Sequence, residues 1–111
     1  MNTRIFLMTV TFVLTATSLT LASPSFDCSK ATGEVEQLIC RDQPLAKLDQ
    51  DLSEVYARAL ANIPEVEHAT TRAMQRGWIK GRNDCWKAEN VRRCVEESYH
   101  TRIVELQIIG G

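Results

Sequence analysis

The four cysteines of this 111-residue chain are the residues best suited to chemistry. They are Cys28, Cys40, Cys85 and Cys94. A thiol oxidoreductase is expected to carry a C-x-x-C pair, and this sequence has none. A zinc site would need further ligands at suitable spacing, and only His68 and His100 could complete one. An even number of cysteines in a short exported chain instead predicts two disulfide bonds.

Four cysteines allow three pairings, and the sequence alone does not choose among them. We prefer local pairing, Cys28 with Cys40 and Cys85 with Cys94, because each pair brackets a turn that could return the chain on itself. Each such bridge is expected to stabilise the fold by about 2 to 4 kcal/mol. The cysteines are therefore expected to act as structural staples.

The N-terminal residues predict export. Residues 1–22 combine Arg4, an apolar uncharged run and a small residue, Ala22, before Ser23, which is the pattern of a cleaved signal peptide. Removing 22 of the 111 residues leaves a domain of 89, residues 23–111. No second hydrophobic segment follows, and Cys28 comes after Ser-Phe-Asp rather than directly after a small-residue stretch. We therefore expect a periplasmic or secreted protein with no membrane insertion after signal cleavage.

The apolar spacing of the remaining chain predicts an all-α fold, a small disulfide-stapled bundle of one short and three longer helices. Thr32 is expected to cap the short helix, which runs to about Cys40, and Asp42 to cap the second. A third helix is expected over residues 65–87, and Asn90 is expected to cap the fourth. The second helix carries an apolar stripe at Leu45, Leu48, Leu52, Tyr56 or Val55, Ala59 and Ile63.

The third helix contains the stretch "RGWIKGRNDCW", residues 76–86. By their spacing, four residues share one face of this helix: Met74, Trp78, Arg82 and Cys85. Trp78 and Cys85 belong in the core, so Arg82 between them needs a carboxylate, because an unpaired buried charge is costly. We predict a structural ion pair with Asp49, which adjoins the stripe of the second helix, with Glu36 behind it.

Three other residues of this stretch carry predictions. Gly77 and Gly81 are four apart, and each costs a helix about 1 kcal/mol relative to alanine. We therefore expect another segment to approach the third helix closely there. Trp86 follows Cys85 toward a flank of the buried face, which favours a half-exposed aromatic anchor for a protein partner.

Charged residues are balanced in number but unevenly distributed. Residues 27–67 hold nine acids and four cations, whereas residues 68–111 hold five acids and eight cations. Two complementary halves that fold against each other would explain this pattern, and a partner-binding asymmetry is the alternative. The export signal and the overall net charge of −1 argue against nucleic acid as a partner.

No set of residues predicts catalysis. A catalytic site needs a nucleophile with an aligned base, or two carboxylates poised over a cleft, and neither occurs at diagnostic spacing. We therefore expect a protein that is not an enzyme and that has no catalytic residues, no cofactor and no metal site.

Four motifs span Phe26 to Leu106: "FDCSKATGEVEQLIC", "PLAKLDQDLSEVY", "RGWIKGRNDC" and "CVEESYHTRIVEL". Together they resemble the LprI-like lysozyme inhibitor family of small exported bacterial domains. The resemblance implies an all-helical, disulfide-bonded domain in the periplasm or outside the cell and, for some members, inhibition of lysozyme. The motif residues are mostly structural, so the resemblance assigns no inhibitory residues.

The function that the resemblance implies is binding of lysozyme as a protein partner, with obstruction of its active-site cleft. The alternative is a periplasmic protein-interaction or envelope-stress module whose target is not lysozyme. Animal lysozymes are typically cationic, so an acidic surface would speed their encounter with the inhibitor. The candidate partner-binding residues are Asp42, Asp51, Glu54 and Trp86.

Overall fold

The structure, a computed structural model, describes residues 3–15 and 21–111. Within these residues the secondary structure is entirely helical. The α-helices are α1 (Glu34–Arg41), α2 (Gln43–Asn62), α3 (His68–Asn83) and α4 (Val91–Ile109), and the short 3-10 helices are η1 (Cys28–Lys30), η2 (Glu65–Glu67) and η3 (Asp84–Lys87). The predicted fold class, a disulfide-bonded bundle of one short and three longer helices, is confirmed.

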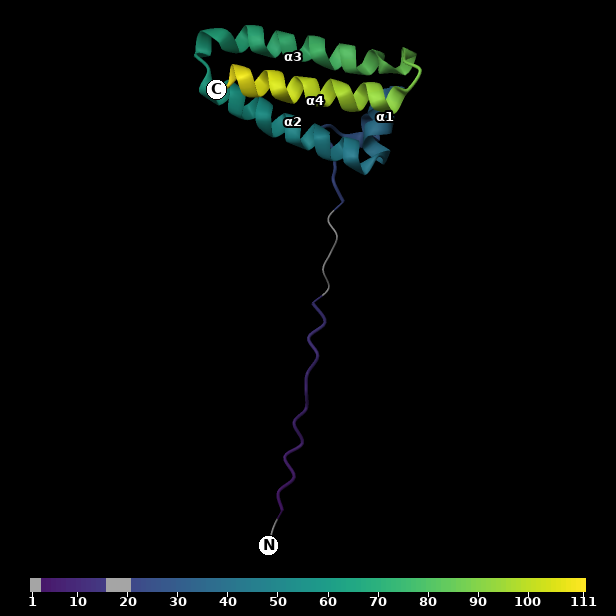
Figure 1. Cartoon of the computed structure of the whole chain (residues 1–111), viewed down its shortest axis with the longest axis vertical. Coiled ribbons are helices and arrows are strands. Elements are labelled where there is room, and N and C mark those ends of the chain that lie inside the picture. Colours follow the sequence, from purple (N-terminus) through teal and green to yellow (C-terminus); the bar gives the residue numbers. More distant parts are fainter. Residues whose placement is uncertain (1–2, 16–20) are drawn as a thin grey trace.

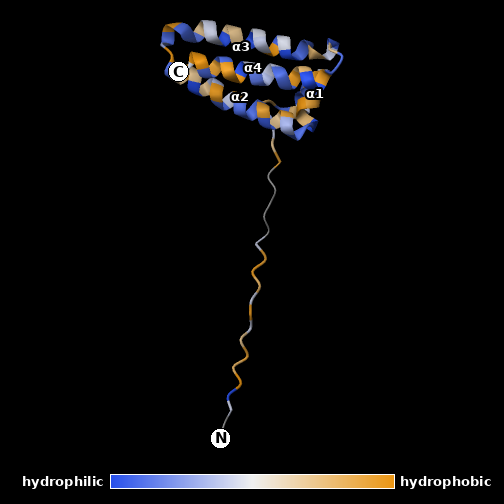
Figure 2. Ribbon diagram, in the orientation of Figure 1, coloured by the Kyte–Doolittle hydropathy of each residue, from blue (hydrophilic) through white to orange (hydrophobic). Residues whose placement is uncertain are grey.

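The three long helices lie side by side, with α4 between α2 and α3 (Figure 1). The short helix α1 packs across one end of this layer, where it contacts α2, α3, α4 and η3. Residues 3–15 extend away from the bundle and are exposed. Figure 2 shows that this segment is mainly hydrophobic, whereas the helices alternate between hydrophobic and hydrophilic residues.

The predicted signal peptide, residues 1–22, includes residues 1–2 and 16–20, which lie outside the described part of the chain. Its cleavage, and the division into a leader and a domain of residues 23–111, stay predictions. Among the helices of the described residues, none combines the length and the apolar character needed to cross a bilayer.

The core forms where the apolar stripes of the helices meet. On α2 the fully or nearly buried residues are Leu45, Ala46, Leu52, Val55 and Ala59, and on α4 they are Val95, Tyr99 and Leu106. Val35 and Ile39 of α1 cover the end of this core. Spacings of three and four residues place each set on one helix face, so each helix can bury its apolar side while its other side stays in water.

Two of the predicted helix caps are confirmed and one is wrong. The Asp42 carboxylate accepts from the Leu45 amide at 3.1 Å, and the Asn90 side chain accepts from the Arg93 amide at 3.0 Å. The short helix, however, is capped by Gly33 and not by Thr32. Its first helical hydrogen bond runs from the Gln37 amide to the Gly33 carbonyl, so Thr32 lies one residue too early to cap it.

The third predicted helix, residues 65–87, is divided into η2, α3 and η3. Its buried face also differs from the prediction, because Met74 is 52% exposed while Thr71 and Gln75 are buried. Cys85 lies beyond the end of α3, in the 3-10 turn of η3. The face of α3 that enters the core therefore follows the spacing Thr71, Gln75, Trp78 and Arg82.

The expected close approach at Gly77 and Gly81 is wrong. A Cβ atom added at either residue would meet no heavy atom within 4 Å, so both glycines face open space. The close approach in this fold occurs at Gly110, where an added Cβ would lie 2.9 Å from the Ala59 Cα. Gly110 thus allows the end of α4 to pack directly on the backbone of α2.

The surroundings of Gly77 and Gly110 predict opposite effects on stability when each glycine is replaced by alanine. Gly77→Ala should raise the free energy of unfolding by about 0.5 to 1 kcal/mol, because alanine favours the helix and its methyl group enters free space. Gly110→Ala should lower it, because the new methyl group overlaps Ala59. Urea denaturation of both variants beside the parent protein measures the two signs. A destabilising Gly77→Ala would contradict the open surroundings of this residue.

Candidate functional site

Both disulfides lie at the same end of the bundle. Cys28–Cys40 joins η1 to α1 with a Cα–Cα distance of 5.9 Å, and Cys85–Cys94 joins η3 to α4 at 5.6 Å. These bridges are the local pairing expected from the positions of the cysteines. Because α1 packs against η3, the two bridges stiffen one region, which we call the stapled end: η1, α1, η3 and the first turns of α2 and α4.

The structure brings the predicted pair, Asp49 and Arg82, together in the core. The Arg82 Nη1 lies 3.7 Å from the Asp49 Oδ1. Tyr99 of α4 bridges them: its hydroxyl accepts from Arg82 Nη1 at 3.0 Å and donates to Asp49 Oδ1 at 2.7 Å. All three residues are at most 4% exposed. Burial raises the pKa of the Tyr99 phenol well above its ordinary value, so the hydroxyl keeps the proton that it donates.

The rest of the Arg82 guanidinium is also engaged. Its Nε and Nη2 donate to the Asn83 Oδ1 at 3.1 and 2.9 Å, and Asn83 in turn donates to the Glu36 Oε1 at 3.4 Å. Glu36 therefore lies behind the pair, as expected, but reaches it through Asn83. The rings of Phe26, Trp78 and Tyr99 surround the guanidinium at 5.6 to 5.9 Å.

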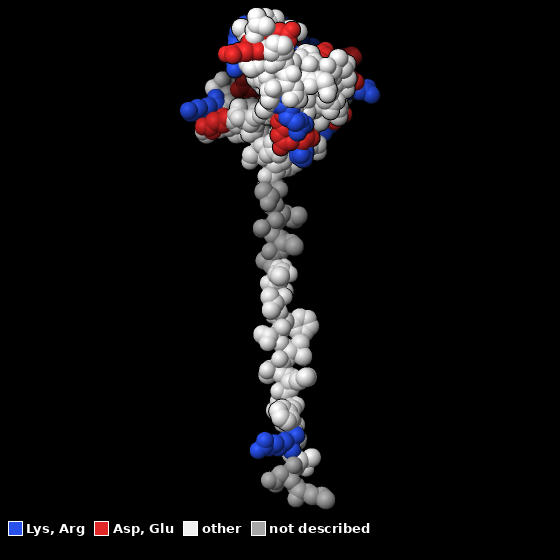
Figure 3. All heavy atoms as spheres, turned by 90° about the vertical axis from the view of Figure 1, so that its left-hand side faces the viewer, with Lys and Arg blue, Asp and Glu red and all other residues white. Residues whose placement is uncertain are grey.

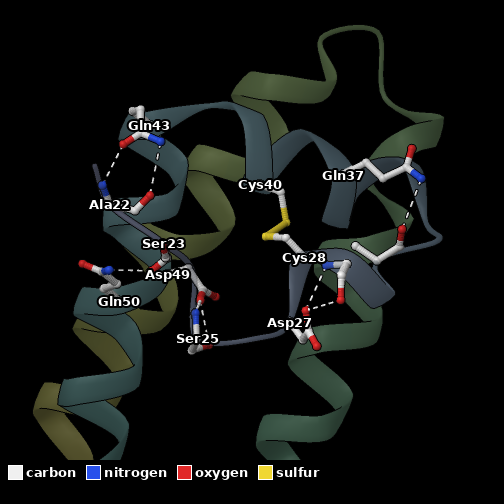
Figure 4. The surroundings of a disulfide bond; sticks show 12 residues. Ala22, Ser23, Ser25, Asp27, Cys28, Gln37, Cys40, Gln43, Asp49 and Gln50 are labelled. Atoms are coloured by element: carbon white, nitrogen blue, oxygen red, sulfur yellow. Dashed lines mark hydrogen bonds between the residues drawn. A yellow bond between two sulfur atoms is a disulfide. The ribbon is translucent and has the colours of Figure 1, made fainter. Parts of the chain in front are cut away.

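The second oxygen of Asp49 is bound by the segment before the first disulfide. Both the amide and the hydroxyl of Ser25 donate to the Asp49 Oδ2 at 2.6 Å (Figure 4). Gln43 exchanges two hydrogen bonds with the backbone of Ala22, and Gln50 donates to the Ser23 carbonyl. We call residues 22–30 the strap, because this segment runs across α2 and is then fixed by Cys28–Cys40.

A pocket of about 340 Å³ opens between the strap and α3, beside this cluster. Its polar walls include Asp49, Gln75 and Arg82, which already bind one another or other side chains. The buried cluster is therefore suited to holding four segments of the chain in place: the strap, α2, α3 and α4.

A second buried cation, Arg102, forms hydrogen bonds that were not predicted from the sequence. Arg102 is 3% exposed; its Nε donates to the Gln75 Oε1 at 2.9 Å and its Nη1 to the Glu105 Oε2 at 3.1 Å. Within the described residues its Nη2 has no hydrogen-bond partner. The sequence does hold a signal for this network. Arg102 comes three residues after Tyr99 and four before Leu106, so it lies on the buried face of α4, where a cation requires hydrogen-bond acceptors.

Ion pairs also connect the acidic and basic halves of the sequence. Arg92 on α4 donates to the Asp42 Oδ2 at 2.8 Å and to the Glu96 Oε2 at 2.9 Å. With Asp49–Arg82, this pair joins residues 27–67 to residues 68–111, which supports the interpretation of complementary halves. Figure 3, which views the end opposite to the stapled end, shows acidic and basic side chains beside one another there as well.

The four residues predicted to bind a partner do not form one cluster. Trp86 lies on η3 at the stapled end, is 55% exposed and has the Lys87 ammonium 5.5 Å from its ring centroid. Asp42 belongs to the same end but is engaged by Arg92. Asp51 lies further along α2 in an ion pair with Lys47, and Glu54 is exposed on the next turn. Among the described residues, no group of three or more His, Cys, Asp or Glu side chains is placed to hold a metal ion.

The stapled bundle corresponds to a known protein family. Residues 28–106 match the model of the family described as "Lysozyme inhibitor LprI". Proteins named "Lipoprotein LprI" from Mycobacterium bovis and Mycobacterium tuberculosis are 40% identical to the chain over 87 residues, which is 78% of this chain and 43% of theirs. The chain thus spans less than half the length of these relatives. No solved structure matches it.

The buried cluster predicts a large loss of stability when one partner is removed. Asp49→Leu leaves the Arg82 charge uncompensated and should lower the free energy of unfolding by about 3 to 5 kcal/mol. The double variant Asp49→Leu with Arg82→Met removes both charges, so it should be more stable than Asp49→Leu alone. Urea denaturation measures this recovery. A double variant as unstable as the sum of its single substitutions would show that the two charges do not depend on each other.

The pair at Asp42 predicts an acid-dependent loss of stability. The hydrogen bond from Arg92 holds the pKa of the Asp42 carboxyl below its ordinary value of 3.8. A lowered folded-state pKa means that this stabilisation is present above the unfolded value and is lost as the pH falls through the folded value. Asp42→Asn keeps a good helix cap but removes the charge. Its free energy of unfolding should therefore decline less than that of the parent between about pH 4 and about pH 2; equal declines would exclude this contribution.

Proposed function

The chain belongs to the LprI family of lysozyme inhibitors, and from this membership we propose that it is an exported bacterial protein that binds lysozyme and inhibits it. The observation that carries the proposal is the extent of the family match. Residues 28–106 include both disulfides, the buried Asp49–Arg82–Tyr99 cluster and nearly all of α4. The whole folded bundle, and not an isolated motif, is therefore the unit shared with the family.

We propose that the stapled end enters or covers the active-site cleft of lysozyme. Two disulfides and the Asp42–Arg92 pair hold this end in one shape, so binding costs little ordering entropy. Trp86 supplies a large, half-exposed aromatic surface there, and tryptophan is enriched among the residues that dominate binding energy. A rigid end that carries one aromatic anchor is suited to occupying a preformed cleft.

Acidic side chains near this end support the encounter with a cationic lysozyme. Glu54 is exposed, while Asp42 and Asp51 are engaged by Arg92 and Lys47. Long-range attraction depends on the summed charge of a surface, so paired carboxylates contribute less than free ones. We therefore assign Asp42, Asp51 and Glu54 to steering, with the largest part from Glu54, which is unpaired among the described residues, and Trp86 to the contact that keeps the complex together.

An interaction module for another envelope protein is the second candidate. The observation in its favour is the length of the relatives, of which the matching region makes up 43%. Their activity can depend on residues outside the matching region. A fold is shared more widely than a partner, so the two candidates must be separated by measuring lysozyme activity directly.

The proposal predicts inhibition in a peptidoglycan lysis assay. The protein should slow lysis by at least one of three enzymes: an animal c-type lysozyme, an animal g-type lysozyme and a bacterial muramidase. Trp86→Ala should weaken the inhibition by about tenfold or more, the effect of losing a dominant interface residue. Val66→Ala removes an 86% exposed apolar side chain from η2, which is not part of the stapled end, and should leave inhibition unchanged. Failure to slow all three enzymes would favour the second candidate.

A further inference from the structure

One side of α3 carries only positive charge. Arg72, Arg76 and Lys80 are exposed and are spaced four residues apart, so they form a line along the helix. The sequence of α3, His68–Asn83, contains no acidic residue. Among the described residues, none of these three cations lies within 4.0 Å of a carboxylate. We call these three residues the basic face.

The exposed sides of the other long helices carry cations that are paired with acids. On α2, Lys47 is paired with Asp51 four residues later. On α4, Arg92 is paired with Glu96 and Arg93 with Glu97, again four residues apart. Opposite charges at this spacing stabilise a helix and like charges destabilise it. The basic face therefore differs from the exposed sides of the other long helices in the described residues, because its like charges four residues apart repel each other.

We propose that the basic face binds the anionic surface of a phospholipid bilayer, with the protein lying on the bilayer and not inserted into it. The three cations cover about 12 Å along a straight helix, since each residue rises by about 1.5 Å. An extended array of phosphates can contact all three at once, whereas a small anion cannot. At the edge of the layer of helices, α3 can approach such a surface without obstruction by α2 (Figure 1).

A bilayer fits this face better than a dissolved polyanion. Ile79 follows Arg76 by three residues and Arg72 by seven, so it lies beside them, and it is 37% exposed. An apolar side chain gains from contact with the boundary between headgroups and acyl chains, but gains nothing from a hydrated polymer. The combination of a basic line with an adjacent isoleucine therefore favours lipid.

Among the described residues, none of the acids near α3 forms an ion pair with the basic face. Asp84, one turn beyond Lys80, is engaged by Lys87 at 3.6 Å, and Glu67 precedes the first turn of α3. Asp27 and Glu36 line a pocket together with Ile79, but neither lies within 4.0 Å of one of the three cations. The binding is independent of the proposed inhibition, because the basic face runs along the side of the bundle and leaves Trp86 at its end uncovered.

Vesicle sedimentation tests this inference with protein recovered after export, whose N-terminus is determined by mass spectrometry. The probes are vesicles with about 30% phosphatidylglycerol, purely zwitterionic vesicles, and inorganic polyphosphate in solution. A cation near an anionic bilayer strengthens binding about fivefold. A triple variant that combines Arg72→Gln, Arg76→Gln and Lys80→Gln should therefore bind the anionic vesicles about a hundredfold more weakly. A higher salt concentration should weaken the binding of the parent protein.

The matched control removes three cations elsewhere: Lys47→Gln and Arg58→Gln on α2 and Arg93→Gln on α4. Circular dichroism and thermal unfolding verify that both triple variants fold. The proposal predicts that the control binds the anionic vesicles much better than the variant of the basic face. Equal losses in the two variants, no binding by the parent protein, or binding to polyphosphate but not to vesicles would each overturn it. Since lysozyme inhibition is measured separately, its absence would leave this result intact.

Discussion

The contact on which the rest of the structure depends is the buried meeting of Asp49, Tyr99 and Arg82. Each comes from a different long helix, and Ser25 of the strap occupies the remaining oxygen of Asp49. Taking two opposite charges out of water is costly, and their attraction compensates only when their hydrogen-bonding groups are satisfied. The positions of α2, α3, α4 and the strap are thereby linked, because a shift of any one would leave a buried charge or hydroxyl without a partner.

The two disulfides reinforce this arrangement on one side only. A domain of this size buries a modest fraction of its surface, so a core of short apolar stripes needs additional constraints. Both bridges lie at the end where α1 and η3 meet, close to the strap and to the Asp42–Arg92 pair. At the opposite end the direct contact is between Gly110 and Ala59, a packing contact without a covalent link. The covalent constraints within the described residues are thus concentrated at the end that carries Trp86.

Local signals made the fold and part of the buried cluster predictable. Asp42 and Asn90 precede apolar periodic segments, which identifies them as caps, and Asp49 and Arg82 interrupt apolar faces, which suggests that they pair. The bridging role of Tyr99 and the two hydrogen bonds of Ser25 depend on contacts between distant segments, which no periodicity encodes. The prediction of a close approach at Gly77 and Gly81 failed for the same reason. The sequence shows that a glycine destabilises its own helix, but the space around that glycine depends on where the other helices lie.

The division between buried and exposed polar residues bears directly on function. Asp49, Arg82, Tyr99 and Gln75 use their hydrogen bonds inside the bundle, so they can specify the scaffold but cannot select a partner. Selectivity must then reside in side chains that remain free at the surface, since binding energy is concentrated in a few accessible residues. In the described part of the chain two such features are spatially separate: the exposed ring of Trp86 on the stapled end and a line of cations along α3. A scaffold held rigid from within can present both without a change of shape, which allows one small domain to face two different surfaces.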